Sequence, residues 1–185
     1  RSLEGVCVFH AVEPGLVGQN LITLKDMNGK PVIHYITEIA KRPEPKAAGW
    51  VFYLWEDKTQ LTPMWKSAYI RKAVGPDGKI YAVGSGSYNT KIEKAFVHER
   101  VNMACELLKT KGRESAFSDL HNPAMPFHFL DTFVFVLDRK GCTLVDPSFP
   151  THAGRDLSQM QDAVGMYVIK EILAKLEKGE EAYVQ

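Results

Sequence analysis

The sequence is poor in cysteine and has no long apolar run. Its cysteines, Cys7, Cys105 and Cys142, form neither a CxxC pair nor a metal-ligand spacing, so they indicate no zinc or redox site. Cys7 and Cys142 lie in apolar runs, where a free cysteine is usually a small buried side chain. No apolar stretch is long enough to cross a bilayer. These absences leave the cellular compartment open.

An excess of charge of one sign is also absent. The chain has 23 Lys and Arg against 22 Asp and Glu, a formal net charge of +1, and the two signs are interspersed. There is no basic stripe and no acidic tail, so nucleic acid is not an expected partner. Hydrophobic residues make up 45% and charged residues 24% of the chain, which is typical of a folded globular protein.

Recognisable catalytic motifs are missing as well. The sequence has no G-x-S-x-G and no H-E-x-x-H, and His121 with His128 does not match a metal spacing. The run from Gly84 to Gly86 lacks the third glycine of a dinucleotide fingerprint, and close packing of a strand explains these glycines better. We therefore predict no enzymatic activity, no metal site and no cofactor.

What the chain does contain is an internal repeat. A shift of 136 positions superimposes nine pairs of identical residues without a gap: Gly5 and Gly141, Pro14 and Pro150, Gly18 and Gly154, Leu21 and Leu157, Asp26 and Asp162, Gly29 and Gly165, Val32 and Val168, Ile33 and Ile169, and Ile36 and Ile172. A period of this length indicates two copies of one small domain. We therefore expect a piece of a longer protein that begins part-way into one copy and stops part-way through the next.

The first copy predicts a strand, a helix and three further strands. Residues 5–10 have the composition of a strand. Residues 29–41 carry apolar side chains at the helical period, and prolines follow. Aromatic and β-branched runs at 49–55, 64–72 and 79–87 predict an antiparallel meander, since a Pro-Asp-Gly turn separates the last two.

A long helix and the start of the second copy follow. Thr90 and Glu93 form a candidate capping box for a helix that runs to about Lys111, with Gly112 as its C-terminal signal. Residues 132–137 and 142–145 predict a hairpin, then a second amphipathic helix, then a strand that begins at Tyr183. The predicted class is α+β, in two partial units over residues 1–89 and 90–185.

The order of these runs resembles Cache sensor domains. The segment from Thr132 to Pro147 is similar to the first hairpin of that family. Gly18–Leu21 and Gly154–Leu157 are similar to its next loop, and Gly49–Trp55, Lys66–Tyr69 and Val83–Gly86 to its last three strands. The resemblance implies a PAS-like antiparallel sheet of about five strands per complete unit, with a long N-terminal helix.

The same resemblance implies a function. It predicts a periplasmic or extracellular module that binds a small ligand, a carboxylate or an amino acid, and feeds signal transduction such as chemotaxis. A membrane would be reached only through segments outside this chain. Exposed sheet edges also predict self-association or strand exchange. Two alternatives stay open: an interaction or scaffold module without a ligand, and, third, an enzyme of unknown type.

Candidate ligand-binding residues lie on the strands of the two copies. They are His10, Trp50, Tyr53, Lys66, Tyr69, Arg71 and Asp146. Aromatic walls with one cation suit a small anion, because charge-assisted contact offsets its desolvation. Strand alternation places Trp65, Ser67, Tyr69 and Arg71 on one face and Lys66, Ala68 and Ile70 on the other. His10 and Asp146 occupy equivalent positions, and local backbone contacts are the competing explanation for both.

Overall fold

The computed structural model describes residues 1–56, 60–179 and 184. The chain forms two compact units, of which unit 1 comprises Arg1–Arg100 and Pro123–Thr132, and unit 2 comprises Val101–Asn122 and Phe133–Gln185. Neither unit is therefore one continuous segment of the sequence. The strand expected at Tyr183 lies outside the described residues.

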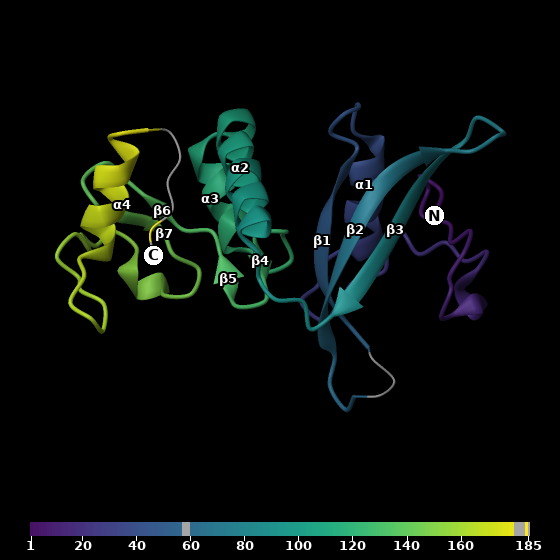
Figure 1. Ribbon diagram of the computed structural model, residues 1–185, viewed down its shortest axis with the longest axis horizontal. Coiled ribbons are helices and arrows are strands. Elements are labelled where there is room, and N and C mark those ends of the chain that lie inside the picture. The colour runs from purple at the N-terminus through teal and green to yellow at the C-terminus, as the bar shows by residue number, and fades with distance from the viewer. Residues whose placement is uncertain (57–59, 180–183, 185) are drawn as a thin grey trace. The chain divides into compact units, whose positions relative to one another are not determined.

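Unit 1 contains a three-stranded antiparallel sheet in the order β1-β2-β3 (Figure 1). The strands are β1 (Ala48–Trp55), β2 (Met64–Val74) and β3 (Ile80–Tyr88), which confirms the predicted meander. In the tight turn between β2 and β3, the Gly75 N–H donates to the Lys79 carbonyl at 2.8 Å. Gly78 has a φ of 73° in that turn, a conformation that glycine adopts without a steric penalty.

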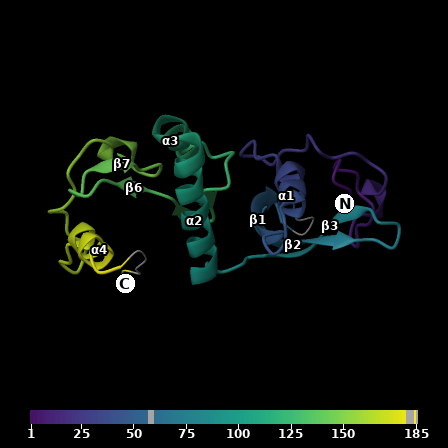
Figure 2. The same cartoon turned by 90° about the horizontal axis from the view of Figure 1, so that it is seen from above.

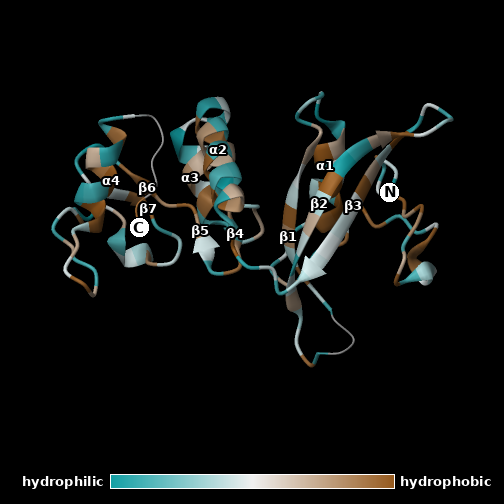
Figure 3. Ribbon diagram, viewed as in Figure 1, coloured by the Kyte–Doolittle hydropathy of each residue, from teal (hydrophilic) through white to brown (hydrophobic). Residues whose placement is uncertain are grey.

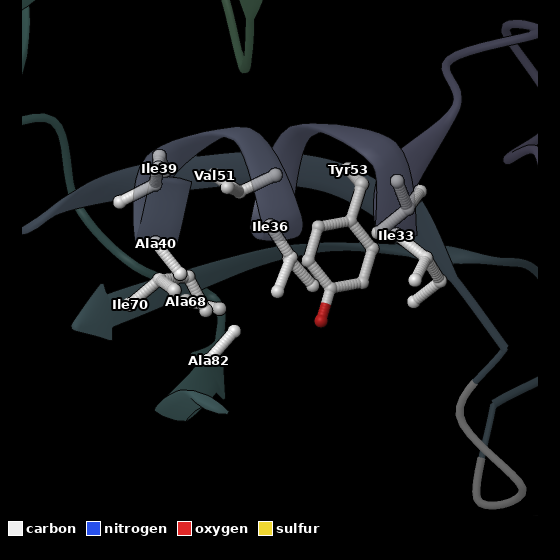
Figure 4. Close-up of a cluster of buried hydrophobic side chains, with 10 residues drawn as sticks. Ile33, Ile36, Ile39, Ala40, Val51, Tyr53, Ala68, Ile70 and Ala82 are labelled. Carbon is white, nitrogen blue, oxygen red and sulfur yellow. The ribbon is translucent and has the colours of Figure 1, made fainter. Parts of the chain in front are cut away.

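Helix α1 (Val32–Lys41) covers one face of this sheet, as Figure 2 shows from above. Its apolar residues recur at the helical period, so one side of the helix is buried. They pack on alternate residues of the strands, and the resulting core is drawn in Figure 4. The buried residues of this core are Val32, Ile33, Ile36, Ile39, Ala40, Val51, Tyr53, Ala68, Ile70 and Ala82.

The opposite face of the sheet carries an aromatic cluster, which consists of Phe52, Phe96 and Phe129 with Trp50 and Trp65 at its border. The Phe52 ring centroid lies 5.1 Å from that of Phe96 and 4.3 Å from that of Phe129. Phe96 belongs to the first turn of α2 (Lys94–Lys111). The aromatic cluster therefore covers part of this face, while Tyr69 and Val83 on the same face remain exposed.

Two local predictions for unit 1 are wrong. Residues 5–10 form no strand: Val6 makes a single bridge with Asn20, and Cys7 exchanges backbone hydrogen bonds with the loop at 18–19. The capping box is also absent, because α2 begins only at Lys94. The Thr90 hydroxyl instead contacts the hydroxyls of Ser67 and Ser87.

Unit 2 contains short elements. Gly112 ends α2 as predicted, but a further helix, α3 (Arg113–His121), follows it directly. The predicted hairpin is found between β6 (Val136–Leu137) and β7 (Thr143–Val145). The first two residues of the run form β5 (Thr132–Phe133), which pairs instead with β4 (His128–Phe129). Helix α4 (Val168–Leu176) is the predicted second amphipathic helix.

The sequence repeat is reproduced in the backbone hydrogen bonds. In the first loop–helix segment (residues 5–41), the Gly18 N–H donates to the Cys7 carbonyl at 2.8 Å; in the second loop–helix segment (residues 141–177), Gly154 donates to Thr143 at 2.7 Å. Each segment also contains a short 3-10 turn, Pro14–Leu16 in the first and Pro150–His152 in the second. In each turn, the N–H of the last residue donates to the carbonyl of the residue that precedes the turn. The α+β class is therefore observed, with one loop and helix built twice.

Candidate functional site: a cavity between helix α1 and the sheet

A cavity of about 260 Å³ lies in unit 1, between α1 and the sheet. Its apolar wall is formed by the core-facing side chains of α1, β2 and β3: Val32, Ile33, Ile36, Ala68, Ile70 and Ala82. Figure 4 shows the Tyr53 ring between Ile33 and Ile36. The cavity therefore extends from the core of unit 1 to exposed residues at the end of β3, such as Val83 and Ser85.

Polar side chains converge on this apolar space from three parts of unit 1. Arg1 and His10 come from the N-terminal segment, and Tyr53 and Lys66 come from facing positions of β1 and β2. Among the described residues that line the cavity there is no carboxylate. The site therefore combines positive charge with hydrogen-bond donors, which suits an anionic ligand.

Arg1 is the functional candidate that sequence reasoning missed. Its α-amino group donates to the Ala82 carbonyl at 2.9 Å, and the Ala82 N–H donates back to the Arg1 carbonyl at 2.9 Å. Directly opposed residues share a sheet face, so the Arg1 side chain lies on the cavity side with Ala82. Its Nη1 atom is buried and has no hydrogen-bond partner among the described residues. A buried donor without an acceptor is costly, so a ligand oxygen would stabilise it.

Tyr53 and Lys66 are directly opposite each other in the β1–β2 register. Burial raises the pKa of the Tyr53 hydroxyl to about 12, so this group stays protonated and can donate a hydrogen bond at neutral pH. The Lys66 ammonium lies 4.8 Å from the centroid of the Tyr88 ring. These two predicted site residues therefore lie together on the cavity side of the sheet.

His10 and Asp146 play the same local part in the two copies. His10 Nδ1 accepts a bond from the Glu13 N–H at 2.9 Å, and Asp146 Oδ1 accepts one from the Phe149 N–H at 2.9 Å. This bond assigns the proton of the neutral His10 ring to Nε2, and His10 is one of the residues that line the cavity. Asp146 also contacts His152 Nδ1 at 3.0 Å and belongs to unit 2, so it does not join the cavity.

Trp50, Tyr69 and Arg71 are not brought to the cavity, because strand alternation turns them to the opposite face. The Trp50 and Tyr69 rings face each other at 5.1 Å between centroids, and Arg71 is exposed at the sheet surface. The register thus confirms the predicted division of β2 into two faces. It separates the three residues from Tyr53 and Lys66.

Two buried cations lie beside the aromatic cluster, and neither is signalled by any local pattern. Lys30 is 1% exposed, and its ammonium donates to the carbonyls of Phe52 at 2.9 Å and His128 at 3.1 Å. Burial lowers the pKa of Lys30 to about 8, against the opposing pull of Asp26. Burial also lowers the pKa of Arg100, whose guanidinium donates to the Trp50 carbonyl at 2.8 Å. Lys30 is thus held by backbone carbonyls, whereas Arg100 also pairs with the Glu99 carboxylate at 3.3 Å.

The described residues contain no group of His, Cys, Asp and Glu side chains that could hold a metal ion. No helix in the described ranges is both long and apolar enough to cross a membrane. The cavity of unit 1 is the candidate site.

Three solved structures of sensor domains are similar to part of this chain. One is the periplasmic sensor domain of a chemotaxis protein, with 29% identity and a TM-score of 0.40, where the match covers 49% of this chain and 58% of that one. A methyl-accepting chemotaxis protein from Vibrio parahaemolyticus RIMD 2210633 has 26% identity and a TM-score of 0.39, with 47% and 54% covered. A Cache chemosensory domain described for carboxylic acid recognition has 32% identity and a TM-score of 0.40, with 49% and 57% covered. The chain thus spans just over half the length of these relatives.

No curated protein matches the sequence. The profile of one family, the single Cache domain 2, does match it, over residues 2–102 and again over residues 98–185. The protein is therefore a sensor-type domain, and the chain belongs to the single Cache domain 2 family. The two matched segments confirm the predicted tandem resemblance. Members of this family are non-enzymatic, which confirms the prediction that the chain is not an enzyme.

Proposed function

We propose that the chain is a ligand-binding sensor module whose cavity in unit 1 holds a small organic carboxylate or an amino acid. The observation that carries this proposal is the buried Arg1 Nη1, which lines the cavity without a hydrogen-bond partner among the described residues. Guanidinium groups bind carboxylates through two parallel hydrogen bonds. The lack of a carboxylate among the described lining residues supports the same assignment.

Each remaining polar residue has a defined part in this proposal. Lys66 adds a second positive charge, Tyr53 donates its hydroxyl, and His10 donates through Nε2. The apolar wall from α1 and β2 receives the carbon chain of the ligand. A cavity of about 260 Å³ lies below the range of about 300–1,000 Å³ that is usual for drug-sized ligands, so it favours a compound of few heavy atoms.

Family membership supports a wider setting for the module. We propose that it lies in the periplasm or outside the cell, and that ligand binding feeds signal transduction such as chemotaxis. Residues 1–89 and 90–185 would belong to two successive Cache domains, each with a sheet of about five strands when complete. This division follows the sequence repeat, and its bounds differ from those of unit 1 and unit 2. The recurrence of the same loop hydrogen bonds in residues 5–41 and 141–177 supports this organisation.

Calorimetry with a panel of short carboxylates and amino acids tests the binding site. If a compound binds, Arg1→Gln should weaken it by about thirtyfold or more, because the variant removes one partner of a buried charge pair. The matched control is Arg71→Gln, since Arg71 carries the same charge on the opposite face. Equal affinity in the wild type and Arg1→Gln would contradict the site. No binding by any compound would favour the ligand-free interaction module instead.

A further inference from the structure

A short segment that follows α3 lies along the outer edge of β1. In the described part of the chain, β1 is the first strand of its sheet and pairs only with β2, so its other edge is left for a different kind of neighbour. Figure 3 shows hydrophobic stretches along β1, and the strand carries no charged residue. Such an edge tends to pair with other chains unless it is covered. We call residues 124–129, which belong to unit 1, the strap.

Lys30 links the strap to β1. Its ammonium donates to the carbonyl of Phe52 at 2.9 Å and to the carbonyl of His128 at 3.1 Å. The first of these carbonyls belongs to β1 and the second to the strap. A buried cation therefore joins two backbones, each of which presents an acceptor that needs a donor.

Arg100 makes the same kind of link two residues earlier. Its guanidinium donates to the Trp50 carbonyl at 2.8 Å and to the Pro126 carbonyl at 3.4 Å. From the Arg100 link to the Lys30 link, both backbones advance by two residues, so the strap runs parallel to β1. Because Pro126 has no N–H to donate to a neighbouring strand, the side-chain cations supply donors that the backbone lacks.

Other contacts hold the strap in place. The Tyr35 hydroxyl of α1 donates to the Ala124 carbonyl at 3.2 Å, Phe129 packs on Phe52, and Phe127 is buried. The residues directly before and after 123–132 in the sequence belong to unit 2. A strap that leaves the edge of β1 therefore stays tethered at both ends, and its departure exposes both phenylalanines.

The charge of Lys30 opposes this docking. Burial lowers the pKa of Lys30 to about 8, while Asp26 raises this pKa and Arg100 lowers it. Of the other elements packed here, β2 contributes the Trp65 ring, whose centroid lies 5.4 Å from the ammonium, and the strap contributes the titratable imidazole of His128. When the strap leaves, Lys30 regains contact with water and with it a higher affinity for a proton. Opening is therefore coupled to proton uptake.

We propose that the strap is a proton-coupled latch: its detachment from β1 takes up a proton at Lys30, so the strap is held more firmly as the pH rises. The open form uncovers the uncharged edge of β1 together with the aromatic side chains of the strap. The latch is a property of unit 1 and does not depend on the ligand of the cavity.

The test measures chymotrypsin cleavage after Phe127 and Phe129 in the full chain, by mass spectrometry, from pH 7 to pH 9. Both side chains are buried in the closed strap, so cleavage reports the open population. Each rate is divided by that of Lys30→Met at the same pH, which removes the pH dependence of the protease. The ratio should fall by about tenfold over this range, because the pKa of Lys30 changes from 10.5 to about 8 when the strap closes.

Lys30→Arg is the matched control, since arginine donates similarly but stays charged throughout this range. Its rate relative to Lys30→Met should not change with pH, and wild-type rates divided by those of Lys30→Arg should show the same tenfold fall. Cleavage after Phe52, which is buried in β1, reports opening of the sheet itself and should be slower.

A wild-type ratio that does not change with pH would overturn the proposal, and so would an equal fall in Lys30→Arg. Cleavage in the strap no faster than cleavage after Phe52 would also overturn it, because the strap would then open only when the sheet of unit 1 unfolds.

Discussion

The first and second loop–helix segments share their backbone hydrogen bonds but differ in burial. In α1 the residues Val32, Ile33, Ile36, Thr37, Ile39 and Ala40 are buried, whereas in α4, all of whose residues are described, Ile169 alone is. The two helices carry the same apolar pattern, with Ile36 equivalent to Ile172. Among the described residues, α1 lies against a three-stranded sheet and α4 does not.

The repeated sequence determines the backbone path of the loop, whereas the burial of the following helix depends on the elements around it. Glycines at positive φ and short backbone contacts define the loop in both copies: Gly5 and Gly141 have φ values of 93° and 88°. The extensive burial of the helix and the cavity occur in the copy whose helix lies against the three-stranded sheet. The candidate site therefore depends on the sheet as well as on the repeated element.

The largest expected difference concerns equivalent isoleucines. Ile36→Ala should cost about 2–5 kcal/mol of unfolding free energy, because it leaves a hole in the core of unit 1. Ile172→Ala should cost under about 1 kcal/mol, since Ile172 is only half-buried. Urea unfolding of both variants measures this difference. Equal losses would show that α4 is as well packed as α1.

A second difference concerns Lys30 and its counterpart Met166. Because the pKa of Lys30 falls from 10.5 to about 8 in the folded protein, the unfolded chain binds more protons between these values. Unfolding free energy should therefore rise with pH, by about 2 kcal/mol from pH 7 to 9.5. Lys30→Met should lack this contribution. The test is the difference between the two proteins in urea unfolding across that range; parallel pH profiles would refute the assignment.

The smallest expected effect on stability concerns His10 and Asp146, whose side chains accept the equivalent backbone bond in the two copies. His10→Asp should change the unfolding free energy by no more than about 0.5 kcal/mol, because Asp146 accepts the same bond in the second copy. The new negative charge should still weaken carboxylate binding by about tenfold or more. His10→Asn, which keeps an acceptor for the Glu13 N–H without adding charge, is the control and should lose less affinity than His10→Asp, because it removes only the Nε2 hydrogen bond. A similar loss of affinity in both variants would show that the negative charge of the new aspartate is not the cause of the weaker binding.

The sequence allowed the regular elements to be predicted where a pattern was local. The meander, α1 and α4 follow from periodicity and turn residues, and the two faces of β2 follow from alternation. The failures involve partners distant in sequence. Arg1 reaches the cavity through β3, and Thr90 contacts Ser67 rather than its own helix. Residues 5–10 have strand composition, but Gly5 at positive φ and the loop at 18–19 give them an irregular path.

For the ligand site, sequence reasoning identified three of the residues that line the cavity: His10, Tyr53 and Lys66. It could not separate them from Trp50, Tyr69 and Arg71, because residue type does not reveal which sheet face a helix will cover. Alternation defines two faces, and only tertiary packing decides which of them encloses a cavity.

The return of residues 123–132 to unit 1 has a consequence for synthesis on the ribosome. The second carbonyl held by the Lys30 ammonium belongs to His128, so this contact must wait until the whole of α2 and α3 has been translated. Phe129 reaches the aromatic cluster at the same late stage. During elongation, the nascent sheet would thus expose its apolar aromatic face after α1 has packed against the other face. A chaperone would be most useful during that interval.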